Sequence, residues 1–250
     1  MSCTLTIGGQ TSTSTVLPSV LTNVTPTALT NGGNYTWNVT CTDQTSNVNS
    51  AVRNVLIDTA APTVNLTLTG TANGAGWYKS AVTVTINATD ATAGIDRILW
   101  SNVSGSSFTS ALGTGVQFTV SSNLSNGYIY YKANDTAGNL ATEKQQQVKY
   151  DSVAPDVTAV TPGSALVAQG ASIALSVATT DSISGLASAN YTLDAATGSL
   201  ALGTNQFTGT VTAPSSDGTF TLYVTVIDTA GNSLTNDTQI TVNSSMPTMT

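Results

Sequence analysis

Alternating apolar and polar residues mark three segments of this chain as β-strands. Because successive side chains of a strand point to opposite faces, an apolar face of period two indicates a half-buried strand. The apolar positions are Tyr35, Trp37, Val39 and Cys41, then Ile129, Tyr131 and Ala133, then Phe220, Leu222, Val224 and Val226. No stretch has a convincing apolar period of 3.6 residues, so the sequence predicts an all-β fold.

The same pattern predicts further strands. In the segment 81–89, Val82, Val84 and Ile86 are expected to point inward, and the segment 97–100 is expected to form the next strand. The Asn-Gly pair at 126–127 and the Asp-Gly pair at 217–218 are typical of tight turns. We therefore expect a turn before each of two strands.

Two sequence markers repeat with a period of 92 or 93 residues. The first is Asp-x-x-x-Asn at 43–47, 135–139 and 228–232, and its last two copies read Asp-Thr-Ala-Gly-Asn. The second ends in a proline, at 57–62, 150–155 and, more loosely, 242–247. Two markers in one phase indicate a structural repeat, and its length is that of one immunoglobulin-like (Ig-like) β-sandwich.

The markers predict tandem Ig-like β-sandwich domains. We expect an incomplete domain at 1–60, whose strands A and B are missing, Ig-like domains at 61–154 and 155–246, and the start of a next-domain strand at 247–250. Proline fixes φ and ends a β-ladder, so Pro62 and Pro155 predict semi-rigid linkers and an extended rod. Two explanations of the first domain stay open. Either the chain is a window on a longer repeat protein, or a strand from a neighbouring subunit completes the sheet.

Composition narrows the class of protein. The 250 residues contain six Lys and Arg, 13 Asp and Glu and no His, which gives a formal net charge of −7. Nucleic acid and anionic membrane surfaces attract basic proteins, so neither is an expected partner. No run approaches the ~20 apolar residues of a membrane span.

The sequence offers little for catalysis. It lacks the His that general-base chemistry most often uses, a Gly-x-Ser-x-Gly elbow, a phosphate-binding Gly-rich loop and a His and Cys cluster. The acidic residues are spread through turns and linkers, unlike the paired carboxylates of a glycosidase. We therefore predict that the protein is not an enzyme.

The two cysteines are predicted to form a disulfide. Cys3 precedes the segment 4–7, which aligns with the strand at 97–100, and Cys41 lies near the end of the first alternating strand. In an Ig-like sandwich these two strands are antiparallel neighbours, and a disulfide requires Cα atoms within about 7 Å. The alternative is a pair of buried free thiols.

Asn-x-Ser/Thr sequons are numerous, and we predict that some of them carry N-linked glycans. Asn38 and Asn87 fall on the solvent-facing side of their predicted strands, where a glycan would stay clear of the core. The full set is Asn23, Asn34, Asn38, Asn65, Asn87, Asn102, Asn123, Asn134, Asn190, Asn236 and Asn243.

Calcium is a candidate ligand of oxygen-rich loops near the predicted domain junctions. The candidate ligands are Asp90 with Asp96, and Asp151 with Asp181. The competing explanation, which the residue types favour, is that Asp and Asn stabilise tight turns by bonding their own backbone. No other cofactor is expected.

The segment 33–43, the segment 76–80 with its following strand, and the Asp-Thr-Ala-Gly-Asn motifs carry a resemblance to a known family. They resemble the tandem Ig-like repeats of archaeal and bacterial cell-surface proteins, and Trp-x-Val-x-Cys-x-Asp at 37–43 is most similar to archaeal examples. The first unit departs from the family because its copy at 43–47 lacks the Gly. The resemblance implies an extracellular protein of a surface layer, filament, stalk or adhesin.

We hypothesise that the chain is a structural repeat protein of such an assembly, in which donor-strand complementation joins the subunits. Its expected partners are other copies of itself or neighbouring Ig-like domains of the same polymer. The alternative is an adhesin or carbohydrate-binding accessory module of a larger secreted protein, with cell-surface glycans or proteins as partners. A carbohydrate-binding module needs an exposed aromatic platform. Burial of Trp37, Trp77 and Trp100 would therefore count against it.

Overall fold

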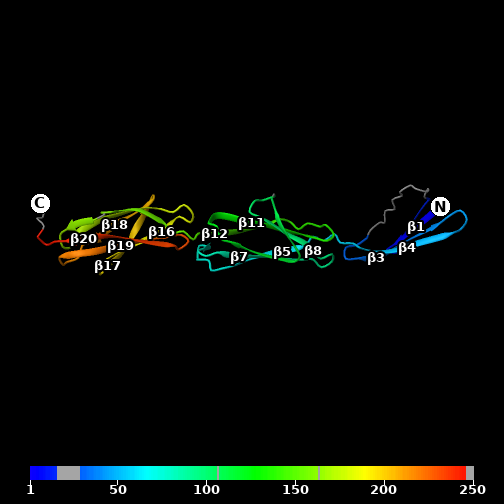
Figure 1. Ribbon diagram of the computed structural model, residues 1–250, viewed down its shortest axis with the longest axis horizontal. Coiled ribbons are helices and arrows are strands. Elements are labelled where there is room, and N and C mark those ends of the chain that lie inside the picture. Colours follow the sequence, from blue (N-terminus) through cyan, green and yellow to red (C-terminus); the bar gives the residue numbers. More distant parts are fainter. Residues whose placement is uncertain (16–28, 106, 163, 246–250) are drawn as a thin grey trace. The chain divides into compact units, whose positions relative to one another are not determined.

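The computed structural model describes residues 1–15, 29–105, 107–162 and 164–245, and every regular element in these ranges is a β-strand (Figure 1). The all-β prediction is therefore confirmed. The strands form sheets of four, three, five and eight members. The predicted next-domain strand at 247–250 lies outside the described residues.

The first sheet has the strand order β2-β1-β3-β4. Its strands are β1 (Ser2–Ile7), β2 (Gln10–Thr15), β3 (Asn34–Thr42) and β4 (Val48–Leu56). Leu5 and Ile7 of β1 pair with Val39 and Trp37 of β3, so these four side chains share one face. Among the described residues 1–56 only Ile7 is fully buried, because these residues form one sheet and supply no second layer.

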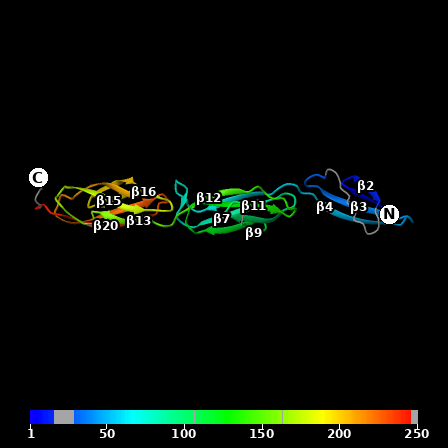
Figure 2. The ribbon, with the colours of Figure 1, turned by 90° about the horizontal axis from the view of Figure 1, so that it is seen from above.

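Two sheets enclose the core of the middle region, and their strand orders are β10-β7-β5 and β6-β12-β11-β8-β9. Val82, Val84 and Ile86 of β7 are buried as the alternation predicts. The strands are β5 (Thr63–Thr69), β6 (Trp77–Tyr78), β7 (Val82–Thr89), β8 (Ile95–Ser101), β9 (Thr109–Leu112), β10 (Gly115–Val120), β11 (Leu124–Asp135) and β12 (Lys144–Tyr150). Figure 1 labels β5, β7, β11 and β12 in this sandwich, and Figure 2 labels β7, β9, β11 and β12.

The last region is one eight-stranded arrangement of order β13-β15-β18-β17-β16-β19-β20-β14 (Figure 2). The strand β17 pairs with both β16 and β18 and so joins what would otherwise be two sheets. The strands are β13 (Asp156–Thr161), β14 (Ser164–Val167), β15 (Ser172–Thr180), β16 (Leu186–Leu193), β17 (Ala196–Gly203), β18 (Gln206–Thr212), β19 (Gly218–Asp228) and β20 (Ser233–Val242).

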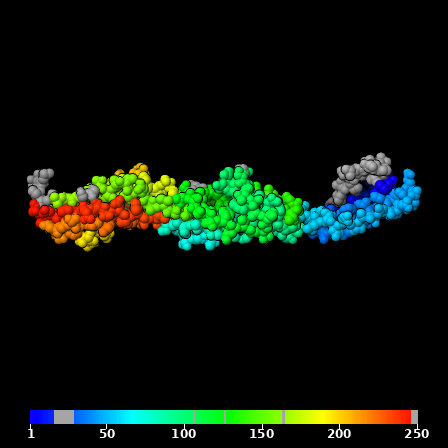
Figure 3. All heavy atoms as spheres, in the orientation of Figure 1, coloured from blue at the N-terminus to red at the C-terminus, as the bar shows by residue number. Residues whose placement is uncertain are grey.

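The core of this last region is built from the inward faces of its strands. In β19, Leu222, Val224 and Val226 are buried and Tyr223 is exposed, as the period of two predicts. They pack with buried residues of β15, β16, β18 and β20, including Phe207. Figure 3 shows the outer surface of this region, which is coloured from yellow-green to red.

The turn predicted at 126–127 is wrong, because β11 runs without interruption from Leu124 to Asp135. Gly127 allows a close approach instead, since a Cβ atom there would lie 2.8 Å from Cδ1 of Leu124. An isolated glycine inside a strand can mark such a close approach.

Contacts between Cα atoms divide the chain into two compact units, and the division passes through the middle sandwich. Unit 1 comprises residues 1–67, 85–116 and 129–145, and unit 2 comprises residues 68–84, 117–128 and 146–250. Each acidic group described below lies within a single unit.

Candidate functional site

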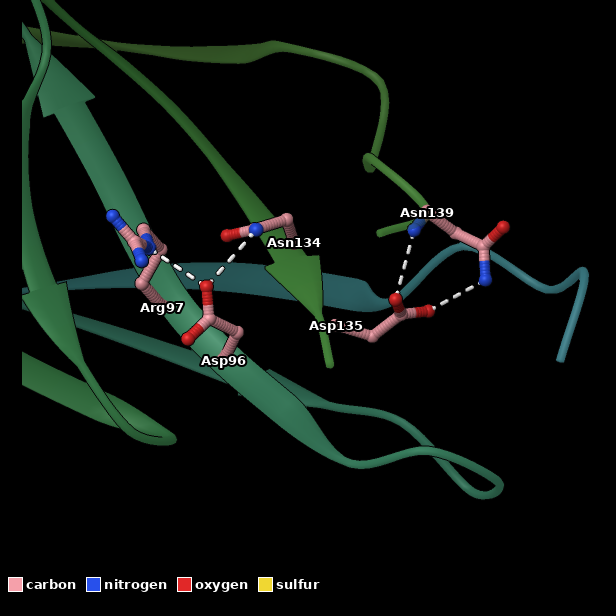
Figure 4. A network of polar contacts seen from close by, with 5 residues as sticks. All are labelled: Asp96, Arg97, Asn134, Asp135 and Asn139. Atoms are coloured by element: carbon pink, nitrogen blue, oxygen red, sulfur yellow. Dashed lines mark hydrogen bonds and ion pairs between the residues drawn. The ribbon is translucent and has the colours of Figure 1, made fainter. Parts of the chain in front are cut away.

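Each Asp-x-x-x-Asn motif forms the same closed turn. In the second copy the backbone N–H of Asn139 donates to Asp135 Oδ1 at 2.8 Å, and Asn139 Nδ2 donates to Asp135 Oδ2 at 2.8 Å (Figure 4). The corresponding distances are 2.9 and 2.9 Å at 43–47, and 2.8 and 2.9 Å at 228–232. This is the self-bonded turn that the residue types favour.

The hydrogen bonds of the turn stabilise the ionised carboxylate. Side-chain bonds from Asn47 and Thr45, with the backbone N–H of Asn47, lower the pKa of Asp43 to about 2. Burial acts to raise the pKa of Asp135, but the bonds from Asn139 and from the backbone of the turn together lower it.

Acid should open the first turn between about pH 4 and pH 2. The folded-state pKa of Asp43 lies below the ordinary 3.8, so its contribution to stability is complete above that value and is lost as the pH falls toward about 2. The measurement is an NMR titration of the Asp43 carboxyl carbon in the full chain, with amide exchange at Asn47. A midpoint at the ordinary value, or exchange at Asn47 that does not change with pH, would contradict this expectation.

The third residue after the Asp takes a left-handed backbone conformation in all three turns. Its φ angle is 96° at Gly138 and 90° at Gly231, but the first copy places Ser46 there at 67°. Residues other than glycine are disfavoured in this region by roughly 1–2 kcal/mol.

Ser46→Gly should therefore stabilise the first sheet by about 0.5–1 kcal/mol, after allowing for the greater freedom of glycine in the unfolded chain. Urea unfolding followed by amide exchange in β3 and β4 measures the change. The matched control is Gly138→Ser, which should destabilise the middle sandwich by about 1 kcal/mol because serine is disfavoured at this φ angle. A Cβ atom at Gly138 meets nothing within 4 Å, so no steric clash adds to this cost. A change of stability in the same direction in both variants would show that the φ angle does not decide the outcome.

The middle and last regions each have a second carboxylate, Asp90 in the loop after β7 and Asp181 in the loop after β15. Asp90 Oδ1 accepts the backbone N–H groups of residues 92–94 at 2.9, 2.9 and 3.1 Å. Asp181 Oδ1 accepts those of residues 183–185 at 3.1, 2.9 and 2.6 Å. Each loop is therefore held by its own Asp.

Each region also has a third carboxylate in the linker that precedes it, Asp58 after β4 and Asp151 after β12. The backbone carbonyl of Asp58 accepts a hydrogen bond from Asn139 Nδ2 at 3.1 Å, and that of Asp151 accepts one from Asn232 Nδ2 at 3.0 Å. These matching bonds attach each linker to the turn of the domain that follows it.

The three carboxylates gather into two equivalent clusters. Within each cluster, one carboxylate oxygen of every member lies within 4.8 Å of those of the others. The first cluster is Asp58, Asp90 and Asp135, and the second is Asp151, Asp181 and Asp228. Three like charges at this separation repel one another, so each cluster is suited to a cation.

Three of the four predicted calcium ligands belong to a cluster, and the fourth belongs to neither. Asp90 belongs to the first cluster, and Asp151 and Asp181 belong to the second. Asp96 lies outside both, because its Oδ2 accepts hydrogen bonds from Arg97 Nε at 2.7 Å and Asn134 Nδ2 at 3.1 Å (Figure 4). The bond from Arg97 lowers the pKa of Asp96.

Sequence reasoning missed three members of the clusters: Asp58, Asp135 and Asp228. The repeat held the signal, because Asp58 occupies the same marker position as Asp151, and the other two open the Asp-x-x-x-Asn motifs. What the spacing did not show is that linker, loop and turn meet.

The Cys3–Cys41 disulfide is present and joins β1 to β3. The two residues face each other in the antiparallel ladder, as the alignment with the strand at 97–100 predicts. The equivalent strands of the middle sandwich, β8 and β11, pair in the same way.

The sequons differ in accessibility. Asn87 is exposed, whereas Asn38 is half-buried and its Oδ1 is buried without a hydrogen-bond partner. Asn23 lies outside the described residues. The other exposed sites are Asn34, Asn65, Asn102 and Asn190, and the other half-buried sites are Asn123, Asn134, Asn236 and Asn243.

The fold and the repeated turns define a tandem Ig-like β-sandwich protein. Residues 160–244 match the family model of the bacterial Ig-like domain. Ig-like domains of this kind are typical of secreted and cell-surface adhesins and are typically non-catalytic.

Two solved structures of titin Ig domains agree on the fold. The I-band fragment I67–I69 of titin is 13% identical, with a TM-score of 0.58 over 96% of this chain and 87% of that chain. A mutated variant of the same titin fragment is 14% identical, with a TM-score of 0.53 over 96% of this chain and 87% of that one. A 1.5-MDa bacterial ice-binding adhesin is 18% identical, with a TM-score of 0.39 over 97% of this chain and 86% of that one. No curated protein matches the chain.

Within the part of the chain that the structure describes, no helix is long and apolar enough to cross a membrane.

Proposed function

We propose that this chain is a non-catalytic spacer segment of an extracellular, adhesin-type surface protein, in which Ig-like domains follow one another in semi-rigid series. The observation that carries the proposal is the repeated linker anchor, in which Asn139 binds Asp58 and Asn232 binds Asp151. A linker that is bonded to the following domain has fewer conformations than a free linker. This restriction suits a spacer that keeps its two ends apart.

The aromatic residues favour a spacer over a carbohydrate-binding face. Trp77 is buried, and Trp37 and Trp100 are half-buried, so none of the three forms an exposed ring platform. In an adhesin-type protein of this design, recognition of the partner belongs to other domains.

The test compares the full chain with the double variant Asn139→Ala and Asn232→Ala by small-angle X-ray scattering. We expect an extended particle whose flexibility increases in the variant, while the control Asn190→Ala leaves the scattering unchanged. Immunogold labelling of the cells that produce the protein should place it on their surface. A compact particle, or labelling confined to the cell interior, would contradict the proposal.

A second candidate function rests on the first sheet. We propose that the half-buried face formed by Leu5, Trp37 and Val39 accepts a strand from a neighbouring subunit, which would complete the core and build a filament or surface layer. Electron microscopy of native material tests this. Ordered filaments support it, and a protein that stays monomeric at every concentration excludes it.

We further propose that glycans occupy exposed sequons, with Asn87 as the best-placed site. Intact-mass analysis of the secreted chain should show a loss of one glycan in Asn87→Gln. An unchanged mass beyond the substitution itself would exclude this site.

A further inference from the structure

The loop before β6 forms the same kind of closed turn as the Asp-x-x-x-Asn motifs. The backbone N–H of Asn73 donates to the carbonyl of Trp77 at 2.8 Å, and Asn73 Oδ1 accepts the N–H groups of Ala75 and Trp77 at 3.0 Å each. In each motif the first and fifth residues make the same two backbone bonds. The φ angle of Gly76 is 78°, so the fourth residue is again left-handed.

This turn differs from the three motifs in its first residue, which is Asn73 instead of an aspartate. Its Nδ2 donates to the carbonyl of Thr229 at 2.7 Å, in the turn 228–232 of the last region. An ionised carboxylate can only accept hydrogen bonds, whereas an amide both accepts and donates. Asparagine can therefore close its own turn and bind the second turn at the same time.

A lysine makes a second bond to the same turn. Lys79 Nζ donates to the carbonyl of Gly231 at 2.9 Å. A Cβ atom placed at Gly231 would lie 3.8 Å from Cδ of Lys79, so the lysine stem also lies against this residue. Because the donor is charged, this bond is stronger than one between neutral groups. Two side chains of the middle region thus bind two carbonyls of one turn.

The linker keeps the two turns close together. The backbone N–H of Asp151 donates to the carbonyl of Tyr78 at 3.0 Å, and Ser152 donates to Asn123 Oδ1 from its N–H and its Oγ at 3.0 and 3.1 Å. The carbonyl of Asp151 accepts Asn232 Nδ2 from the other side. All these residues belong to unit 2. Bonds between groups that a short linker already holds near each other form at a high effective concentration.

The turn is an addition to the sandwich. The strands β6 and β14 occupy the same place, because each pairs in parallel with the last strand of its region. In the last region β13 ends at Thr161 and β14 begins at Ser164, whereas in the middle region β5 ends at Thr69 and β6 begins at Trp77. The sandwich can therefore be built without residues 70–76, and the contacts with the last region give them a role.

We propose that Asn73 and Lys79 form a clasp, which holds the turn 228–232 and limits rotation of the last sandwich against the middle one. The clasp acts in addition to the bonds of the linker and uses different residues. The inference does not rest on the proposed function, because a fixed junction between two sandwiches is compatible with other roles of the chain.

The experiment measures residual dipolar couplings of the weakly aligned full chain, in the wild type and in the double variant Asn73→Asp with Lys79→Met. Asn73→Asp keeps the acceptor of its own turn and removes the donor, and Lys79→Met keeps most of the stem and removes the charge. We expect one alignment tensor to fit residues 63–150 and 156–242 in the wild type, and this common alignment to be lost in the variant. The control Arg53→Met makes the same change of charge in the first sheet and should retain it.

Hydrogen exchange at Ala75 and Trp77 shows whether the turn stays closed in the double variant. If it opens, Lys79→Met alone provides the test, because the ammonium of Lys79 donates to Gly231 and not to its own turn. Separate alignment tensors in the wild type, or a common tensor in a variant whose turn is closed, would overturn the proposal. The scattering test of the spacer function changes Asn139 and Asn232, which are kept here, so the two proposals fail separately.

Discussion

Phe207→Ala should lower the free energy of unfolding of the last sandwich by about 3–5 kcal/mol. Phe207 lies on β18 at 0% exposure, within a core of buried residues from β15, β16, β19 and β20. Removal of its ring loses the transfer free energy of the buried atoms and leaves a cavity that the surrounding strands fill only in part. Hydrogen exchange over residues 156–242 of the full chain measures the loss.

Leu202→Ala is the matched control for this change. Leu202 faces Phe207 across the β17–β18 ladder, but its side chain is 52% exposed. Truncation of an exposed side chain costs within about 0.5 kcal/mol. Similar losses in the two variants would mean that the inward face of β18 does not form the core. In both variants the protection of the first sheet against exchange should stay unchanged.

Much of this fold could be predicted from the sequence, because the alternation in β7 and β19 is regular. Val82, Val84 and Ile86 are buried as expected, and so are Leu222 and Val224. A half-buried strand imposes a period of two on its own residues, so the information is local.

The pairing of β17 could not be predicted in this way. Its residues 196–203 contain two Gly and mix small, polar and apolar side chains without a clear alternating face. Its place is set by partners elsewhere in the chain, since it pairs with β16 at one end and with β18 at the other. Strand partners depend on non-local contacts, which a periodicity does not contain.

The local parts of the candidate site could also be predicted, and its non-local parts could not. The turns at 43–47, 135–139 and 228–232 were predictable, because each Asp bonds residues only two to four positions away. The clusters were not, since Asp151 and Asp228 are 77 positions apart and meet only after the last sandwich has folded. Asp96 belongs to neither cluster, and its Oδ2 accepts a hydrogen bond from the adjacent Arg97 on β8.

Reduction of the Cys3–Cys41 disulfide should destabilise the first sheet by about 2–4 kcal/mol. The bond closes a loop with a sequence separation of 38, so reduction returns conformational entropy to the unfolded chain. The described residues of this sheet bury little apolar surface, and Ile7 is the one fully buried side chain among them. The sheet has little core to offset the loss.

The measurement is hydrogen exchange in β3 and β4 of the full chain, oxidised and then reduced at the same pH. Exchange should accelerate in these strands after reduction, and the double variant Cys3→Ser with Cys41→Ser should behave like the reduced wild type. The strands β19 and β20 contain no cysteine and have their own core, so their protection should not change. If β3 stays equally protected after reduction, the stability of the first sheet comes from packing against its apolar face. That result would favour completion of the sheet by another strand over stabilisation by the disulfide.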